Sequence, residues 1–326
     1  MASALICVGS PLQAICMVEA ISEYSIDTYR LLVIDDGTRL GQIEYFLNKE
    51  KLVFTVIPYH VSSWKNIIRL IGLFNPFKGK YDYLIMGDYR LTGNKIEYIP
   101  FIKNHGQIIY LDDGSYIISL SKGLMKETAV TKVRNRLIGL VCKHRGIINN
   151  NLFTIFSKDL CFKGFSVKEN CLRHFQKRSI SLGNDIYFVG TNPVGYCTFL
   201  GIDYYHYLDV LRSILLEIRQ NNPEVHIVYV PHGRDVSNET IDICKQLNIE
   251  YKRLSICIEL FMLSLDRCPK EIWGVGSSAL YTLRRLFNDT IIKNVTIQGT
   301  NCNSLREYKE IADVYEKNDI ENVWID

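Results

Sequence analysis

The chain has 326 residues, which exceeds one ordinary domain and fits two of average size. Hydrophobic residues make up 47%, enough for two cores, and a net charge of +3 is too small to indicate nucleic acid as the main partner. The ten cysteines form no C-x-x-C pair and complete no zinc pattern, so we expect reduced core thiols. Residues 1–19 lack a basic leader and no apolar run could span a bilayer, so we expect a cytoplasmic protein unless it rests on a membrane surface.

Short apolar segments alternate with amphipathic ones, which is the pattern of a parallel sheet covered by helices. The first series predicts strands at 4–8, 29–34, 52–57, 83–86 and 107–111, and helices at 12–24, 40–49 and 64–73. The second predicts strands at 185–189, 225–230, 249–253, 271–273 and 291–297, and helices at 204–220, 238–247, 259–264, 277–287 and 305–316.

These series predict an α/β chain with two Rossmann-like domains facing a central cleft. We place the N-terminal domain at residues 1–155, a linker at 156–184 and the C-terminal domain at 185–304. The last helix, within 305–326, is expected to return to the first domain. Ligands of such sheets bind beyond the carboxyl ends of the strands, where every motif below lies.

An acidic pair, Asp112-Asp113-Gly114, follows the predicted strand at 107–111. Two carboxylates this close disfavour joint ionisation, so the pKa of one can rise towards the range of a general base. A plain turn is the alternative, because the same string occurs as Asp35-Asp36-Gly37 after another strand.

A histidine on a tight loop, His232, stands between Pro231 and Gly233 at the end of the strand at 225–230. It can donate a proton or a hydrogen bond to a phosphate, and Arg234 adds a cationic fork. The alternative is a surface turn with incidental charge.

A glycine and serine loop, 274–279, opens the helix after the strand at 271–273. Backbone N–H groups at a helix start bind phosphate, and the hydroxyls of Ser277 and Ser278 would add donors. The string also fits a loose dinucleotide fingerprint, but no acidic residue follows at the usual spacing. The alternative is a helix capped by Ser277.

The order of these motifs resembles that of the bacterial sialyltransferases with the GT-B architecture. That superfamily has an acidic-acidic-Gly motif, a His-Pro motif and a serine motif in this order, and here they stand as 112–114, 232–233 and 277–278. The segments 7–13, 87–90 and 187–190 are similar to its first turn, its acceptor-side loop and the strand that opens its second domain. One departure is Gly233, where the family has Pro.

The resemblance implies an inverting, metal-independent transfer of sialic acid from CMP-sialic acid to a glycan, galactose-terminated or lipid-linked, of a bacterial surface polysaccharide. Asp112 is the expected base, Asp113 the alternative, and His232 the residue that stabilises the phosphate or acts as general acid. The implied donor-binding residues are Gly190, His232, Arg234, Glu259 (on the ribose), Ser277 and Ser278, and the acceptor-side residues are Ser10, Gln13, Asp88 and Arg90. No cofactor is expected. A transferase of another CMP-linked keto-sugar acid, or a nucleotide-binding protein without turnover, remains the alternative.

The segment 122–143 is basic and is followed by apolar residues through 156. Two interpretations remain open. The segment either forms a solvated face, or it rests on anionic lipid at the cytoplasmic face of the inner membrane.

Overall fold

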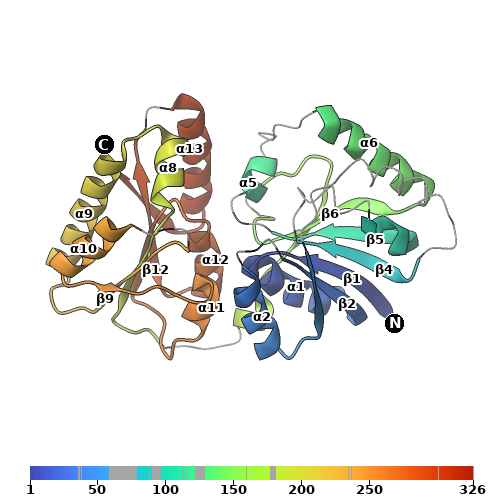
Figure 1. Cartoon of the computed structure of the whole chain (residues 1–326), viewed down its shortest axis with the longest axis horizontal. Helices are drawn as coiled ribbons and strands as arrows, with labels where there is room; N and C mark the ends of the chain where they lie inside the picture. Colours follow the sequence, from blue (N-terminus) through green and yellow to red (C-terminus); the bar gives the residue numbers. More distant parts are fainter. Residues whose placement is uncertain are drawn as a thin grey trace. The chain divides into compact units, whose positions relative to one another are not determined.

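The computed structural model describes the chain except for residues 36, 38, 59–78, 88, 90–96, 113, 115, 122–128, 159, 177–180, 234, 236, 300 and 326. The chain divides into two compact units, Met1–His174 and Phe175–Asp326. Each unit is built on its own parallel sheet (Figure 1). This confirms the expected α/β class with two Rossmann-like units.

The first unit contains, over its described residues, a sheet of seven strands in the order β3-β2-β1-β4-β5-β6-β7, all paired in parallel. Its elements are β1 (Ala2–Val8), α1 (Pro11–Glu23), β2 (Ile26–Asp35), α2 (Leu40–Lys49), β3 (Phe54–Pro58), β4 (Tyr81–Met86), η2 (Ile99–Phe101), β5 (Ile102–Tyr110), α5 (Tyr116–Ser121), α6 (Ala129–His144), β6 (Ile148–Thr154) and β7 (Ser166–Glu169). A short helix, α7 (Arg173–Gln176), spans the division between the units.

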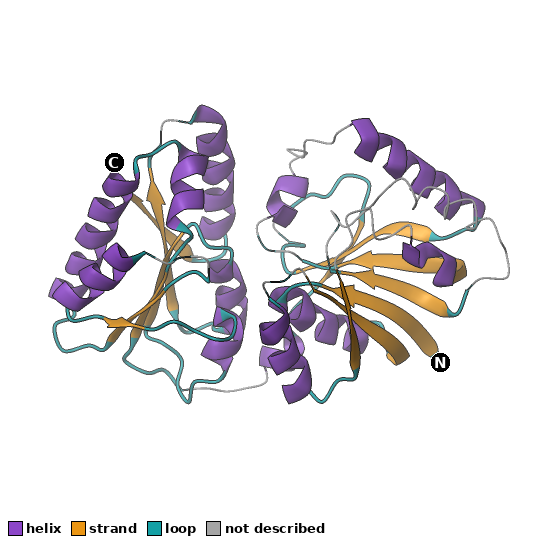
Figure 2. Ribbon diagram, viewed as in Figure 1, coloured by secondary structure: helices purple, strands orange, loops and turns teal. Residues whose placement is uncertain are grey.

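The first sheet is covered on both faces, as its apolar central strand requires. Residues 4–8 of β1 are all buried. Helices α1 and α2 lie on one face, and α5 and α6 lie on the other (Figure 2). Helix α1 starts with Pro11 in its first turn and with Ser10 as its N-cap, whose side chain accepts a hydrogen bond from the N–H of Gln13.

The second unit contains, among the residues described, a parallel sheet of six strands in the order β10-β9-β8-β11-β12-β13. Its elements are β8 (Ile186–Val189), α8 (Pro193–Leu200), α9 (Tyr204–Asn221), β9 (Ile227–Val230), α10 (Asn238–Gln246), β10 (Glu250–Tyr251), α11 (Ile258–Leu263), β11 (Glu271–Val275), α12 (Ala279–Leu286), β12 (Ile291–Ile297), α13 (Cys302–Glu316) and β13 (Ile320–Ile325).

The core of the second unit follows the alternation of its strands. Phe188 of β8 and Tyr229 of β9 stack with ring centroids 5.5 Å apart, and they pack in one cluster with buried residues of α8, α9 and α10. Helices α11 and α12 contact each other, and α12 also contacts β11 and β12. The last helix, α13, contributes Tyr308 to the same cluster as α9.

Both sheets contain a switch point, where the strand order reverses. It lies between β1 and β4 in the first unit, and between β8 and β11 in the second. Loops that leave adjacent strands in opposite directions open a crevice at the carboxyl edge, and ligands of open α/β sheets bind there.

The structure differs from the predicted domain boundaries in two places. Residues 156–174, predicted as part of a linker, belong to the first unit, because β7 pairs with β6. The segment 305–326, expected to return to the first domain, belongs to the second unit. There β13 pairs with β12, and α13 packs on both strands. Both added strands are short and include charged residues, so neither forms an apolar run.

Two kinds of feature are missing from the part of the chain that the structure describes. It contains no group of three or more His, Cys, Asp or Glu side chains that could hold a metal ion. Nor does it contain a helix long and apolar enough to cross a membrane.

Candidate functional site

The turn after β1 lies at the switch point of the first sheet and is held by its own polar groups. The N–H of Gly9 donates to Oε1 of Gln13 at 2.7 Å, and the N–H of Gln13 donates to Oγ of Ser10 at 3.3 Å. Ser10 and Gln13 are both 4% exposed. These two predicted acceptor-side residues therefore shape the turn itself.

The first residue after β4, Gly87, passes very close to this turn. A Cβ added to Gly87 would lie 2.0 Å from Oε1 of Gln13, so a larger residue here would displace the Gln13 amide from Gly9. Its N–H donates to the carbonyl of Cys7 at 2.8 Å. The structure thus brings Gly9, Ser10, Gln13 and Gly87 together, while the predicted residues Asp88 and Arg90 lie outside the described residues.

Asp112 follows β5 and links it to the end of β6. Its Oδ1 accepts a hydrogen bond from the hydroxyl of Thr154 at 2.5 Å, and its Oδ2 accepts one from the N–H of Ile155 at 2.9 Å. The thiol of Cys16 on α1 lies 3.9 Å from the same Oδ2. The hydroxyl oxygen of Thr154 accepts a hydrogen bond from the N–H of Phe156. The hydroxyl proton of Thr154 therefore points to Asp112.

The environment of Asp112 meets one requirement of a general base and leaves another unmet. Burial raises its pKa from 3.8 to about 7, although the hydrogen bonds from Thr154, Ile155 and Cys16 oppose that rise. Its side chain is 0% exposed, so an acceptor hydroxyl reaches it only after a local rearrangement. The alternative base, Asp113, lies outside the described residues.

At the carboxyl edge of the second sheet, β8 and β9 end next to each other. The N–H of Gly190 donates to the carbonyl of Val230 at 2.8 Å, and a Cβ on Gly190 would lie 2.4 Å from the hydroxyl of Tyr229. The loop after β9 exposes His232, whose carbonyl accepts from the N–H of Asp235 at 2.8 Å. The predicted cation Arg234 is not among the described residues.

The serine loop, defined as Gly276, Ser277 and Ser278, follows β11 at the switch point of the second sheet. Gly276 has φ +55°, a left-handed conformation that favours glycine. Ser278 is the N-cap residue of α12, but its side chain makes no capping hydrogen bond. The alternative predicted from the sequence named Ser277 as the cap, whereas the N-cap residue in the structure is Ser278, whose hydroxyl does not cap the helix.

Residues from the end of the chain hold the serine loop in place. The hydroxyl of Tyr315 donates to the carbonyl of Ser277 at 3.0 Å, and the N–H of Gly276 donates to Oδ1 of Asn294 at 3.1 Å. A Cβ on Gly276 would lie 2.3 Å from the hydroxyl of Tyr308. Helix α13 and strand β12 thus fix the loop's backbone.

Glu259 lies in the first turn of α11, after β10, and is 7% exposed. Burial raises the pKa of its carboxyl, against hydrogen bonds from its own N–H and from Cys257 that lower it. Gly190, His232, Glu259 and the serine loop therefore all follow strands at one edge of the second sheet, as predicted.

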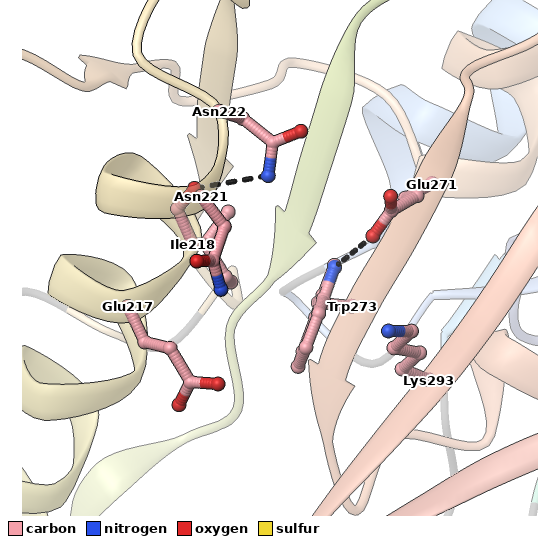
Figure 3. A pocket seen from close by; sticks show the side chains of 7 residues that line it. All are labelled: Glu217, Ile218, Asn221, Asn222, Glu271, Trp273 and Lys293. Atoms are coloured by element: carbon pink, nitrogen blue, oxygen red, sulfur yellow. Dashed lines mark hydrogen bonds between the residues drawn. The ribbon is translucent and has the colours of Figure 1, made fainter.

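A cavity of about 270 Å³ lies elsewhere in the second unit, between the last turn of α9 and the first residues of β11 (Figure 3). Some of its polar groups pair with each other. Nε1 of Trp273 donates to Oε2 of Glu271 at 2.9 Å, and Nζ of Lys293 lies 4.5 Å from the Trp273 ring centroid. Since it lies at the amino end of β11, this cavity is separate from the predicted site.

Sequence reasoning missed the residues that support the motifs. Thr154 and Ile155 were not predicted as partners of Asp112, because β6 was not predicted as a strand. The mostly apolar run at 152–156 could have indicated that strand. Asn294 stands inside a predicted strand, and its side chain gave no reason to expect a bond to Gly276.

No family model and no curated protein matches the sequence, whereas solved structures do match the fold. The α/β-galactoside α-2,3-sialyltransferase of Photobacterium phosphoreum is 11% identical, with 99% of this chain and 98% of that chain covered and a TM-score of 0.51. A sialyltransferase from Photobacterium damsela is 12% identical, covering 99% and 81%, with a TM-score of 0.53. The S. aureus MnaA–UDP structure is 10% identical, covering 99% and 92%, with a TM-score of 0.52.

The fold is that of the GT-B glycosyltransferases. The match runs over nearly the whole chain for each of these three structures. At 10–12% identity the match shows the fold alone. The chemistry has to be inferred from the residues of the site.

Proposed function

We propose that the protein is a glycosyltransferase that moves sialic acid from CMP-sialic acid to a glycan acceptor, with inversion and without a metal ion. The observation that carries the proposal is the serine loop, where the N-cap hydroxyl of Ser278 is not used for capping. The loop stands at a switch point, before the positive end of α12, which suits a phosphate.

In this proposal the second unit binds the donor. Ser277, Ser278 and His232 donate hydrogen bonds to the phosphate, and Glu259 accepts from the ribose hydroxyls. As CMP leaves, negative charge grows on the phosphate, and donors already fixed in place stabilise that charge. Arg234 is the proposed additional cation, and Gly190 lets the backbone stand close to the donor.

The first unit supplies the acceptor side. One carboxylate of the acidic motif, Asp112 or Asp113, removes the proton of the acceptor hydroxyl. Ser10 and Gln13 shape the turn beside it, with Asp88 and Arg90 proposed to contact the acceptor. A lipid-linked or galactose-terminated glycan of a bacterial surface polysaccharide, met at the cytoplasmic side, is the proposed acceptor.

The test begins with the nucleotide. Thermal unfolding is measured with CMP, UDP, GDP and NADH, and transfer from CMP-sialic acid is then assayed with galactose-terminated acceptors. We expect CMP alone to raise the melting temperature and sialic acid to appear on the acceptor. A protein that CMP does not stabilise, or that never transfers or hydrolyses CMP-sialic acid, contradicts the proposal.

A second candidate function is an enzyme that acts on a uridine nucleotide sugar. It rests on the similarity to the MnaA–UDP structure, whose TM-score of 0.52 exceeds the 0.51 of one sialyltransferase. The fold alone therefore does not choose between cytidine and uridine nucleotides. Stabilisation by UDP in place of CMP would favour this candidate. Transfer from another CMP-linked keto-sugar acid, or CMP binding without turnover, would retain the nucleotide site and change only the reaction.

A further inference from the structure

Helix α6 presents two apolar surfaces. One packs on the first sheet, where Ile138, Val141 and Cys142 are 4%, 2% and 1% exposed. The helix contacts β6 on that side. This surface accounts for the place of α6 in the fold.

The second surface is an exposed apolar stripe made of Val133, Leu137 and Leu140. These side chains are 58%, 36% and 63% exposed. Their spacing of four and three residues aligns them on one side of the helix. Among the described residues, no other helix or strand has three exposed large apolar side chains, so the stripe is a local concentration.

The charge beside the stripe is of one sign. Lys132, Arg136 and Lys143 are exposed, and on a helical wheel they lie along one side of the stripe. The 16 residues of α6 contain no Asp or Glu, although the chain as a whole has 35 acidic residues against 38 basic ones. The basic face of this helix is therefore not balanced by acidic residues of the helix itself.

We propose that this face of α6 binds an anionic lipid surface reversibly, with the apolar stripe inserted among the headgroups. A helix of this length lies about 24 Å along the interface. Apolar side chains flanked by Lys and Arg fit a membrane surface, whereas a nucleic acid would use the cations and leave the stripe exposed to water. The proposal goes beyond the proposed function and does not depend on it.

The test is cosedimentation of the whole chain with vesicles of phosphatidylcholine, alone or mixed with phosphatidylserine. We expect binding to the mixed vesicles at low salt, weak binding to the neutral ones, and release at high salt, because salt screens the attraction. Protein that stays in the supernatant with phosphatidylserine at low salt overturns the proposal, as does equal binding to both kinds of vesicle.

Two variants separate charge from insertion. Lys132→Gln, Arg136→Gln and Lys143→Gln together should weaken binding about a hundredfold, at roughly fivefold for each cation. Leu140→Ser with Val133→Ser should weaken binding while leaving its salt dependence in place.

A matched control removes the same charge elsewhere, through the exposed residues Lys49, Lys163 and Lys245, each changed to Gln. It should bind like the wild type, and an equal loss in this control would show that only net charge matters. Gel filtration of each variant tests whether a second copy of the chain, and not lipid, covers the stripe. A stripe that joins two copies of the chain would give a dimer that Leu140→Ser dissolves, and that result would also overturn the lipid proposal.

Discussion

The acidic motif of the first unit follows β5, and the serine loop of the second follows β11, so each lies just after a strand of a parallel sheet. Their polar groups are used differently. Asp112 is fully buried, and its two oxygens accept hydrogen bonds from Thr154, the last residue of β6, and from Ile155, the next residue. Ser277 and Ser278 are half-buried, and the hydroxyl of Ser278 does not cap α12. In the first unit the motif residue Asp112 itself makes the hydrogen bonds that hold the local structure. In the second unit Tyr315 and Asn294, which lie outside the motif, hold the backbone of the serine loop.

The largest expected effect concerns the acidic motif. Asp112→Asn and Asp113→Asn are made separately, and one of them should lower transfer by roughly 10²- to 10⁴-fold, as loss of a general base does. CMP affinity, measured by titration calorimetry, should stay close to that of the wild type in both.

The same two variants distinguish a catalytic role of Asp112 from its structural role as a hydrogen-bond acceptor. Asp112→Asn should also lower the free energy of unfolding, by about 1–3 kcal/mol, because Asn has one acceptor oxygen where both oxygens of Asp112 accept hydrogen bonds, from Thr154 and Ile155. Normal transfer by both variants would mean that Asp112-Asp113-Gly114 is a turn, and the proposed mechanism would be wrong.

The serine loop should behave in the opposite way. Ser277→Ala with Ser278→Ala is expected to weaken CMP binding and to lower transfer by roughly a hundredfold, since two donors to the phosphate are lost. The free energy of unfolding should barely change, because the hydroxyl of Ser278 makes no capping bond. His232→Ala serves as a parallel test on transfer. Unchanged CMP affinity in the double variant would assign the loop a purely structural role.

The pKa of Asp112 makes a prediction about stability and pH. Since folding raises that pKa from 3.8 to about 7, the folded state holds a proton that the unfolded state has lost within this range. Stability from this group is complete below pH 3.8 and is lost as the pH rises to about 7. Urea unfolding should therefore show the wild type weakening relative to Asp112→Asn between pH 4 and 7, roughly by up to 1.4 kcal/mol per pH unit.

Thr154 provides the control for that measurement. Thr154→Val removes a hydrogen bond that lowers the pKa of Asp112, so the transition should move to higher pH. A pH dependence identical in the wild type and in Asp112→Asn would show that this carboxyl does not titrate in the predicted range.

The smallest effects compare two glycines. Gly276→Ala should lower the free energy of unfolding by about 1–3 kcal/mol, because of its positive φ and the nearby hydroxyl of Tyr308. Gly233→Ala should change it by less than about 0.5 kcal/mol, since a Cβ there meets no atom within 4 Å. Thermal unfolding of both variants tests the difference. A loss at Gly233 as large as that at Gly276 would show that the loop after β9 is as constrained as the serine loop.

The sequence predicted the elements whose patterns are regular. Helix α2 at 40–49 and strand β12 at 291–297 have the bounds that periodicity indicated. The strands β6, β7 and β13 were missed because asparagines or charged residues interrupt their apolar residues, and pairing with a neighbouring strand stabilises them. The motifs could be placed after strands, but the burial of Asp112 could not be predicted, since it depends on Thr154 and Ile155, more than 40 residues later.

The place of α13 and β13 in the second sheet has a consequence for the order of events during synthesis. All residues of the first unit have been synthesised once His174 has been added. The serine loop is translated well before Tyr308 and Tyr315, which hold it, and before Asn322, which accepts a hydrogen bond at 2.9 Å from the loop's partner Asn294. A nascent chain can therefore form the surroundings of the acidic motif early, but the serine loop gains its supporting contacts only when α13 and β13 have been made. Ribosome-bound intermediates that end before residue 302 should accordingly contain a folded first unit that does not yet bind CMP.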